Sequence, residues 1–406
     1  MKQFLPVPHV PGPSRSTAPE RGGWGQRLRR ILASDPALRH RFDAIRHYAA
    51  GIRASEYHLT NACNIRCKGC WFFTYEFQKA SRENTDLADL KAFVADEAAR
   101  GVNTALLIGG EPTLFPDRIA VYREAMERVT ISTNGLRRLP RAGFEDITVA
   151  ISLFGGGPLD DELRAVRPSG KRFSDLFGTA LGHYADDPRA GFVYALSEDG
   201  IDHIEDTVRR IHDNGNRVHF NFYSSYDTDD PLRGVRGREL LAEALRVREL
   251  YPDTVASHPY TIEVMITGDA HWDSFGYDVC PSISARHPAH HSRTRNGNPV
   301  LPQFNTWAAD LETVHFCCTS GHCDSCRDSQ AVFSWLMVSP RHFLESAEQL
   351  WTWVHIAESY WSQFYWSPFH PAHRPPATPD PDPATAPAAA PTTGPAPATT
   401  APREGV

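Results

Sequence analysis

The chain has 406 residues, of which 41% are apolar, and a formal net charge of -7 at pH 7. This length and apolar content allow one large domain or two ordinary ones, and the interspersed charges predict neither a nucleic acid nor an anionic membrane as a partner. No window approaches the roughly 18 consecutive apolar residues that a spanning helix needs. The proline-rich N-terminus lacks the apolar run of a signal peptide, so we expect a cytoplasmic protein.

Both ends of the chain have a composition typical of disordered segments. Residues 1–23 are rich in Pro, Gly, Arg and Ser, and residues 367–406 form a tail rich in Pro, Ala and Thr. Such segments bury too little apolar surface to offset the entropy lost on ordering. We therefore expect disorder at both ends, with a helical segment over residues 24–54 before the folded core.

Six strand-like runs alternate with helical patterns over the next part of the chain. The strands are expected at residues 55–60, 104–108, 129–132, 147–153, 192–196 and 218–223, and the helices at 87–100, 119–127, 204–214 and 239–250. This alternation predicts a parallel sheet with helices outside it, either doubly wound or curled into a full or partial barrel. In both folds, ligands bind at the C-terminal ends of the strands. A further strand at residues 261–267 would complete a core over residues 55–267.

The composition changes after this core. Residues 268–366 contain a stretch rich in His, Arg and Pro, five cysteines, and an aromatic helical pattern over residues 341–366. We interpret them as a second module, whose final helix packs through its aromatic side chains.

Three cysteines follow the first expected strand in a CxxxCxxC spacing: Cys63, Cys67 and Cys70. Clustered cysteines in a reducing compartment indicate a metal centre. Three cysteine ligands on a [4Fe–4S] cluster leave one iron open to a small molecule, which indicates chemistry rather than storage. The alternative is a structural zinc ion, which usually takes four Cys or His ligands.

Polar and glycine-rich motifs end the next three strands. They are GGEP at residues 109–112, ISTNG at residues 131–135 and VAISLFGG at residues 149–156. Together with the cysteine spacing, these ordered motifs resemble the radical S-adenosylmethionine (radical SAM) superfamily over about residues 55–223. The resemblance predicts an α/β fold, a partial (βα)6 TIM-like barrel with a C-terminal cysteine-containing module.

The resemblance also implies the cofactors and their sites. Cys63, Cys67 and Cys70 would hold a [4Fe–4S] cluster whose open iron is chelated by the methionine end of SAM. The SAM site would include Gly109, Gly110, Glu111, Pro112, Thr133, Asn134 and Ser152. In place of the aromatic or bulky residue that usually precedes the third cysteine, this chain has Gly69, so the adenine contact would come from Trp71, Phe72 or Phe73.

The family chemistry predicts the reaction type. Reductive cleavage of SAM gives a 5′-deoxyadenosyl radical, which normally takes a hydrogen atom from an unactivated carbon and in some relatives adds to a double bond. We expect a small-molecule or peptide substrate of a natural-product tailoring type, and an electron donor such as flavodoxin or ferredoxin. The rival hypothesis is a non-catalytic binding scaffold stabilised by zinc.

Side chains on the sixth strand are candidates for contact with the substrate. Period-two alternation sends His219, Asn221 and Tyr223 to one side of the strand, and Tyr226 follows it. In a barrel that side faces the substrate. A polar barrel layer without a ligand is the competing interpretation.

A second cysteine group lies in the C-terminal module. It comprises Cys280, Cys317, Cys318, Cys323 and Cys326. Adjacent thiolates rarely reach one metal together, so a four-ligand set would take only one of Cys317 and Cys318. Such a set fits an auxiliary [4Fe–4S] cluster or a structural zinc. We favour the cluster, because radical SAM enzymes, including peptide-modifying and aminoglycoside-dehydrogenating groups, commonly carry such extensions.

Overall fold

The computed structural model describes residues 23–74, 76–222, 236–271, 304–315 and 329–373. All of these belong to one compact unit, residues 1–373, and residues 374–406 form a second unit. Several predicted features lie outside the described residues. These are residues 1–22, most of the C-terminal tail, Tyr223, Tyr226, Cys280, Cys317, Cys318, Cys323 and Cys326.

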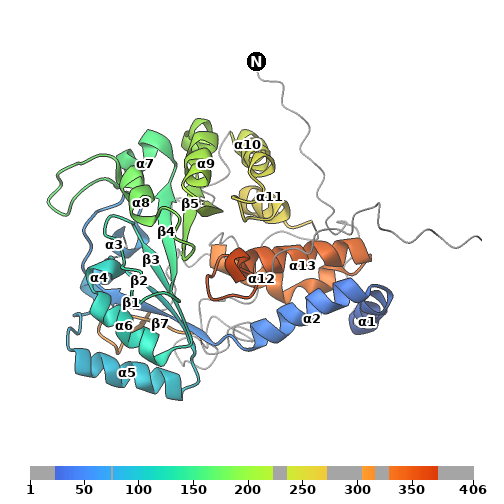
Figure 1. Cartoon of the computed structure of the whole chain (residues 1–406), viewed down its shortest axis with the longest axis horizontal. Coiled ribbons are helices and arrows are strands. Elements are labelled where there is room, and N and C mark those ends of the chain that lie inside the picture. The colour runs from blue at the N-terminus through green and yellow to red at the C-terminus, as the bar shows by residue number, and fades with distance from the viewer. Residues whose placement is uncertain (1–22, 75, 223–235, 272–303, 316–328, 374–406) are drawn as a thin grey trace, which may run out of the picture. The chain divides into compact units, whose positions relative to one another are not determined.

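Parallel strands form the centre of the fold (Figure 1). They are β1 (Ala54–Thr60), β2 (Thr104–Gly109), β3 (Arg128–Thr133), β4 (Thr148–Phe154), β5 (Ala190–Leu196) and β6 (Arg217–Phe222). The strand order is β6-β5-β4-β3-β2-β1-β7-β8, in which β7 (Thr306–Trp307) pairs parallel with β1 and β8 (Val314–His315) pairs antiparallel with β7. Because β1 to β6 are parallel neighbours in chain order, their C-terminal ends share one edge. The predicted parallel α/β core is confirmed.

Helices connect the strands. They are α5 (Leu87–Ala99), α6 (Pro116–Ala125), α7 (Gly157–Arg164), α8 (Leu176–Tyr184), α9 (Ile204–Asp213) and α10 (Gly237–Leu250). Five of these helices bury apolar side chains, whereas the buried residues of α7 are Asp160 and Arg164. The sequence explains their local form. In α9, Ile204, Val208 and Ile211 repeat at helical spacing and all are buried. The Asp86 side chain caps α5 by accepting hydrogen bonds from the backbone N–H groups of Ala88 and Asp89.

The strand expected at residues 261–267 is wrong, because these residues belong to the helix α11 (Pro259–Thr267). Nδ1 of His258 accepts a hydrogen bond from the Tyr260 N–H, 3.2 Å away, which caps the first turn. Gly268 ends the helix in the left-handed region at φ 75°. Six of the nine residues are buried, so the helix is apolar on nearly all sides and shows no helical periodicity.

Helices near both ends of the first unit pack on each other. The expected N-terminal helical segment consists of α1 (Trp24–Ser34) and α2 (Pro36–Ala50), and the C-terminal helices are α12 (Ser329–Val338) and α13 (Ala347–Trp361). Figure 1 shows α13 alongside α2, where the rings of Phe42 and Trp353 lie 5.2 Å apart and Arg41 pairs with Glu358. The aromatic side chains of α13 therefore belong to the core, as expected.

Two predicted boundaries in this region need correction. The aromatic helix begins at Ala347 rather than residue 341, because Pro340–Phe343 form a 3-10 turn (η4) and Ser346 caps the helix. The tail begins later than residue 367, since Ser367 is fully buried and a 3-10 turn (η5) spans Pro371–His373. The remaining short elements are α3 (Trp71–Thr74), α4 (Phe77–Ala80), η1 (Pro112–Leu114) and η2 (Glu198–His203). Within the described residues, no helix has the length and apolar character needed to cross a membrane.

Candidate functional site

A cavity of about 330 Å³ lies at the C-terminal ends of the strands. The structure brings together most of the residues that the sequence selected. Lining this cavity are Cys63, Cys67, Cys70, Gly109, Gly110, Glu111, Thr133, Asn134, Ser152 and Asn221. Pro112 is not among the lining residues and instead begins the turn η1. The shared edge of the parallel strands explains this convergence, because β2, β3, β4 and β6 each end there.

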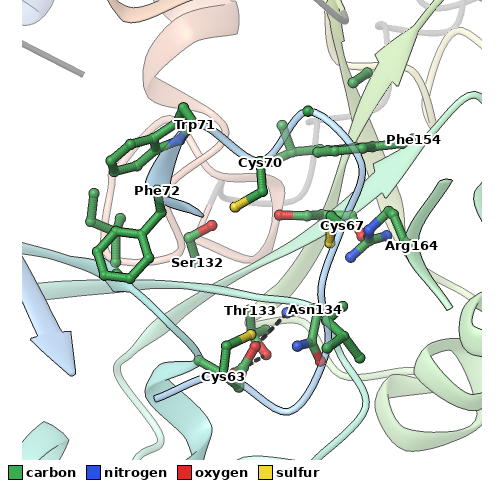
Figure 2. A pocket seen from close by; sticks show the side chains of 18 of the residues that line it. Cys63, Cys67, Cys70, Trp71, Phe72, Ser132, Thr133, Asn134, Phe154 and Arg164 are labelled. Carbon is green, nitrogen blue, oxygen red and sulfur yellow. Dashed lines mark hydrogen bonds between the residues drawn. The ribbon is translucent and has the colours of Figure 1, made fainter. Parts of the chain in front are cut away.

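The three cysteines are half-buried free thiols whose sulfur atoms surround one space (Figure 2). Burial raises the pKa of Cys63 to about 12 and that of Cys67 to about 11, and it also raises the pKa of Cys70. Thiolates in this environment therefore need a cationic partner, such as a metal centre.

The number of thiols bears on the kind of metal centre. Within the described residues, no three Cys, His, Asp or Glu side chains are placed to hold a single metal ion. A structural zinc ion usually takes four Cys or His ligands, whereas three cysteines are a ligand set that leaves one iron of a [4Fe–4S] cluster open.

The cysteine loop is fixed at both of its sides. The Glu83 carboxylate accepts hydrogen bonds from Oγ1 of Thr60 at 3.0 Å and from the Asn61 N–H at 2.7 Å, and it pairs with Arg118. Farther along the loop, the N–H groups of residues 66 and 68 donate to carbonyl oxygens of residues 166 and 163, each at 2.7 Å. These contacts hold both sides of the cysteine loop against neighbouring elements.

Two positions at the site need glycine, one because of its backbone conformation and one because of a close backbone contact. Gly69 has φ 69°, a left-handed conformation that an aromatic residue would adopt only with strain. At Gly110, a Cβ atom would lie 1.9 Å from the carbonyl oxygen of Ala62. The GGEP motif therefore brings the end of β2 into direct backbone contact with the cysteine loop.

Glu111 connects the ends of β2 and β3. Its buried carboxylate accepts hydrogen bonds from Oγ1 of Thr113 at 2.7 Å, Oγ1 of Thr133 at 2.6 Å and the Asn134 N–H at 2.8 Å. Burial raises the pKa of Glu111, and these hydrogen bonds oppose that rise. Glu111 thus orders the polar rim of the cavity through its carboxylate.

Arg164 is a site residue that the sequence reasoning missed. It lies at the end of α7 and donates from Nη1 to the Ser152 carbonyl oxygen at 2.6 Å and to Oδ1 of Asp160 at 2.9 Å. It lines the cavity, and its buried Nε has no hydrogen-bond partner among the described residues. The sequence feature that could have identified Arg164 is its position four residues after Asp160 in a helix that follows β4, because residues at this spacing can form an ion pair on one helix face.

Aromatic side chains form part of the cavity wall. Trp71, Phe72 and Phe73, all considered in the sequence, line it, and so does Phe154 from the end of β4, which was missed. The Arg164 guanidinium lies 5.0 Å from the centre of the Phe154 ring. Figure 2 shows Trp71 and Phe72 on one side of the cysteines and Phe154 on the other.

Asn221 is the candidate from the sixth strand that reaches the cavity. Its side-chain oxygen accepts a hydrogen bond from the Phe222 N–H at 2.8 Å, which leaves the NH₂ group as a donor. His219, on the same side of β6, lines a different cavity instead.

Comparison with known proteins gives one family and several distant relatives. Residues 57–233 match the family model described as the radical SAM superfamily. The chain is 30% identical over 104 residues to a GTP 3',8-cyclase of Mannheimia succiniciproducens, covering 23% of this chain and 31% of that protein. It is 29% identical over 121 residues to an Fe-coproporphyrin III synthase of Methanosarcina barkeri, covering 27% and 29%. These matches span less than a third of either relative's length.

The solved structures that match are also distant in sequence. Native anSMEcpe with bound AdoMet matches with a TM-score of 0.44 at 11% identity, covering 65% of this chain and 74% of that one. Methylornithine synthase (PylB) matches with a TM-score of 0.35 at 15% identity, covering 77% and 91%.

Proposed function

The chain belongs to the radical SAM superfamily, and we propose that it cleaves SAM reductively at a [4Fe–4S] cluster held by Cys63, Cys67 and Cys70. The observation that carries this proposal is the meeting of the three thiols with the polar ends of β2, β3 and β4 in one cavity. Membership of the superfamily implies both the cluster and SAM. When bound, they supply a 5′-deoxyadenosyl radical.

The described residues fit these groups. The three thiols supply the usual iron ligands of such a cluster. Arg164 brings a buried guanidinium to the cavity beside Ser152, and a guanidinium suits the carboxylate of SAM. Glu111 holds Thr133 and Asn134 in place at the same rim.

Other cavity residues would bind the substrate and exclude water. Trp71, Phe72 and Phe154 give the wall an apolar surface, which lowers the water content around reactive species. The NH₂ group of Asn221 can donate a hydrogen bond to a substrate carbonyl or hydroxyl group. The adenine ring would lie against Trp71, Phe72 or Phe73, since Gly69 carries no side chain.

The reaction that follows is hydrogen abstraction from an unactivated carbon of a small-molecule or peptide substrate, of a natural-product tailoring type. Addition of the adenosyl radical to an alkene is the alternative. The reducing electron would come from a donor such as flavodoxin or ferredoxin, and neither a nucleic acid nor a membrane is a proposed partner.

The C-terminal cysteines would hold a second [4Fe–4S] cluster, with zinc as the alternative metal. They lie outside the described residues.

Iron content after anaerobic reconstitution tests this assignment of ligands. Replacing Cys63, Cys67 and Cys70 with Ala should remove one [4Fe–4S] cluster, about four irons per chain, together with its electron paramagnetic resonance signal. A triple variant that keeps the iron content of the unmodified chain would contradict the proposal. Roughly one zinc per chain, with no iron, would support the binding-scaffold hypothesis instead.

A further inference from the structure

A second cavity, of about 180 Å³, lies at the opposite, N-terminal ends of β5 and β6. Residues 187–191, 215–217 and 219 line it from the start of β5 and β6, and residues 362, 363 and 370–372, which follow α13, also line it. It shares no lining residue with the cavity that holds the cysteines. Any ligand here is therefore distinct from SAM and from the proposed substrate.

His219 gives this cavity a buried polar atom without a partner. Only 9% of the residue is exposed, and Nε2 has no hydrogen-bond partner among the described residues. Buried polar nitrogens usually have a hydrogen-bond partner, so one without a protein partner usually meets a ligand or water. Burial, with a smaller contribution from Arg217, lowers the pKa of His219 to about 3, so the ring is neutral at physiological pH.

The charged groups around the cavity favour an anion. Arg217 brings a permanent positive charge, and its guanidinium also donates to the carbonyl oxygens of Asp253 at 3.4 Å and Ser362 at 3.2 Å. The carboxylate of Asp187 is neutralised by Arg189, with Nε–Oδ1 at 3.0 Å and Nη2–Oδ2 at 2.6 Å. The lining therefore carries a net positive charge.

Other polar groups of the lining supply further donors. Nδ1 of His370 accepts a hydrogen bond from the Ala372 N–H at 3.2 Å, which places a ring proton on Nε2. Gln363 adds a side-chain amide. At Gly191, a Cβ atom would meet nothing nearer than the Arg217 carbonyl oxygen at 3.8 Å, so this position leaves space for a ligand.

We propose that this cavity binds a small oxyanion, such as a phosphate or carboxylate group, through the Arg217 guanidinium and the Nε2–H of His219. The bound anion would link the starts of β5 and β6 to the segment after α13. A metal ion is the weaker alternative, because no third metal-ligating side chain joins the two imidazoles within the described residues.

The test is nuclear magnetic resonance of the full chain labelled with ¹⁵N-histidine, titrated with inorganic phosphate at constant ionic strength. Sulfate and acetate serve as comparison anions. We expect a saturable shift of the His219 ring signals. Charge-assisted hydrogen bonds contribute about 1.5–3 kcal/mol, so His219→Gln and Arg217→Met should each weaken phosphate binding about tenfold or more.

The control variant is His47→Gln, which changes an exposed histidine on α2 and should leave the phosphate affinity unchanged. Absence of a saturable response, or equal affinity in all variants, would overturn the proposal. Zinc alone binding to the unmodified chain, but not to His219→Gln, would replace it with a metal site. Circular dichroism of each variant separates loss of binding from loss of folding.

Discussion

The Arg164 guanidinium lies beside the Cys67 thiol in the wall of the cavity (Figure 2). Burial raises the pKa of Cys67, and Arg164 acts in the opposite direction by favouring the thiolate. The same guanidinium is anchored by Asp160 and by the Ser152 carbonyl oxygen. One positive charge therefore favours the thiolate of a proposed cluster ligand, and we propose that it also binds the carboxylate of SAM.

Replacing Arg164 with Met should weaken SAM binding to the reconstituted chain by about tenfold to a hundredfold. This range corresponds to the loss of charge-assisted hydrogen bonds of about 1.5–3 kcal/mol. Equilibrium dialysis with labelled SAM measures the affinity. Arg164→Lys keeps the charge beside Asp160 and should give an intermediate affinity. A folded Arg164→Met variant that binds SAM as the unmodified chain does would exclude this role.

The Glu111→Gln variant should destabilise the rim of the cavity. The Gln amide has one oxygen and one NH₂ group, so it cannot accept hydrogen bonds at both positions where the Glu111 carboxylate has an oxygen. At least one buried donor would lose its acceptor: the Thr133 hydroxyl, the Thr113 groups or the Asn134 N–H. We expect the free energy of unfolding to fall by about 1–3 kcal/mol, measured by urea denaturation of the metal-free chain. Glu145→Gln, at an exposed position, is the control. Equal stability of the two variants would contradict the account.

The Gly110→Ala variant should fold but incorporate less iron. The added methyl group would meet the Ala62 carbonyl oxygen at 1.9 Å and push the cysteine loop away from β2. Iron per chain after anaerobic reconstitution gives the result, and circular dichroism checks the fold. The matched control is Gly182→Ala in α8, where a Cβ atom meets nothing within 4 Å. Full iron incorporation in Gly110→Ala would show that the loop tolerates the displacement.

His258 should make the stability of the chain depend on pH in the acid range. Burial lowers its pKa to about 3 from its ordinary value of 6.5, so below pH 6.5 the unfolded chain binds a proton that the folded chain does not. Stability is therefore highest above pH 6.5 and decreases as the pH falls toward 3. At pH 5 this single group would lower the free energy of unfolding by about 2 kcal/mol.

The variant His258→Asn tests this effect, because Asn can cap α11 but does not titrate. Urea denaturation of the metal-free chain at pH 7 and pH 5 should show a smaller loss of stability in the variant, by about 2 kcal/mol. An identical loss in both proteins would mean that His258 does not control the acid response.

The sequence predicted the parts of the site that follow from strand order. Parallel strands that are neighbours in the chain end at one edge, so the Cys63–Cys70 loop, Glu111 and Ser152 had to meet. The strand predicted at residues 261–267 was wrong because α11 is buried on nearly all sides. Its apolar residues therefore show no helical periodicity, and a short apolar run is typical of a buried strand as well as of a buried helix. Arg164 was missed because it belongs to no motif and enters the cavity only through the packing of α7 on β4. Phe154 lies within the VAISLFGG motif, but nothing in that motif distinguished it from an ordinary core residue.

Formation of 5′-deoxyadenosine from SAM tests the central claim most directly. The anaerobically reconstituted chain, reduced with dithionite, should produce it. The Cys63/Cys67/Cys70→Ala variant should produce none, while Gly182→Ala should match the unmodified chain. Production at the unmodified rate by the triple cysteine variant, or none by a chain loaded with its cluster, would contradict the account.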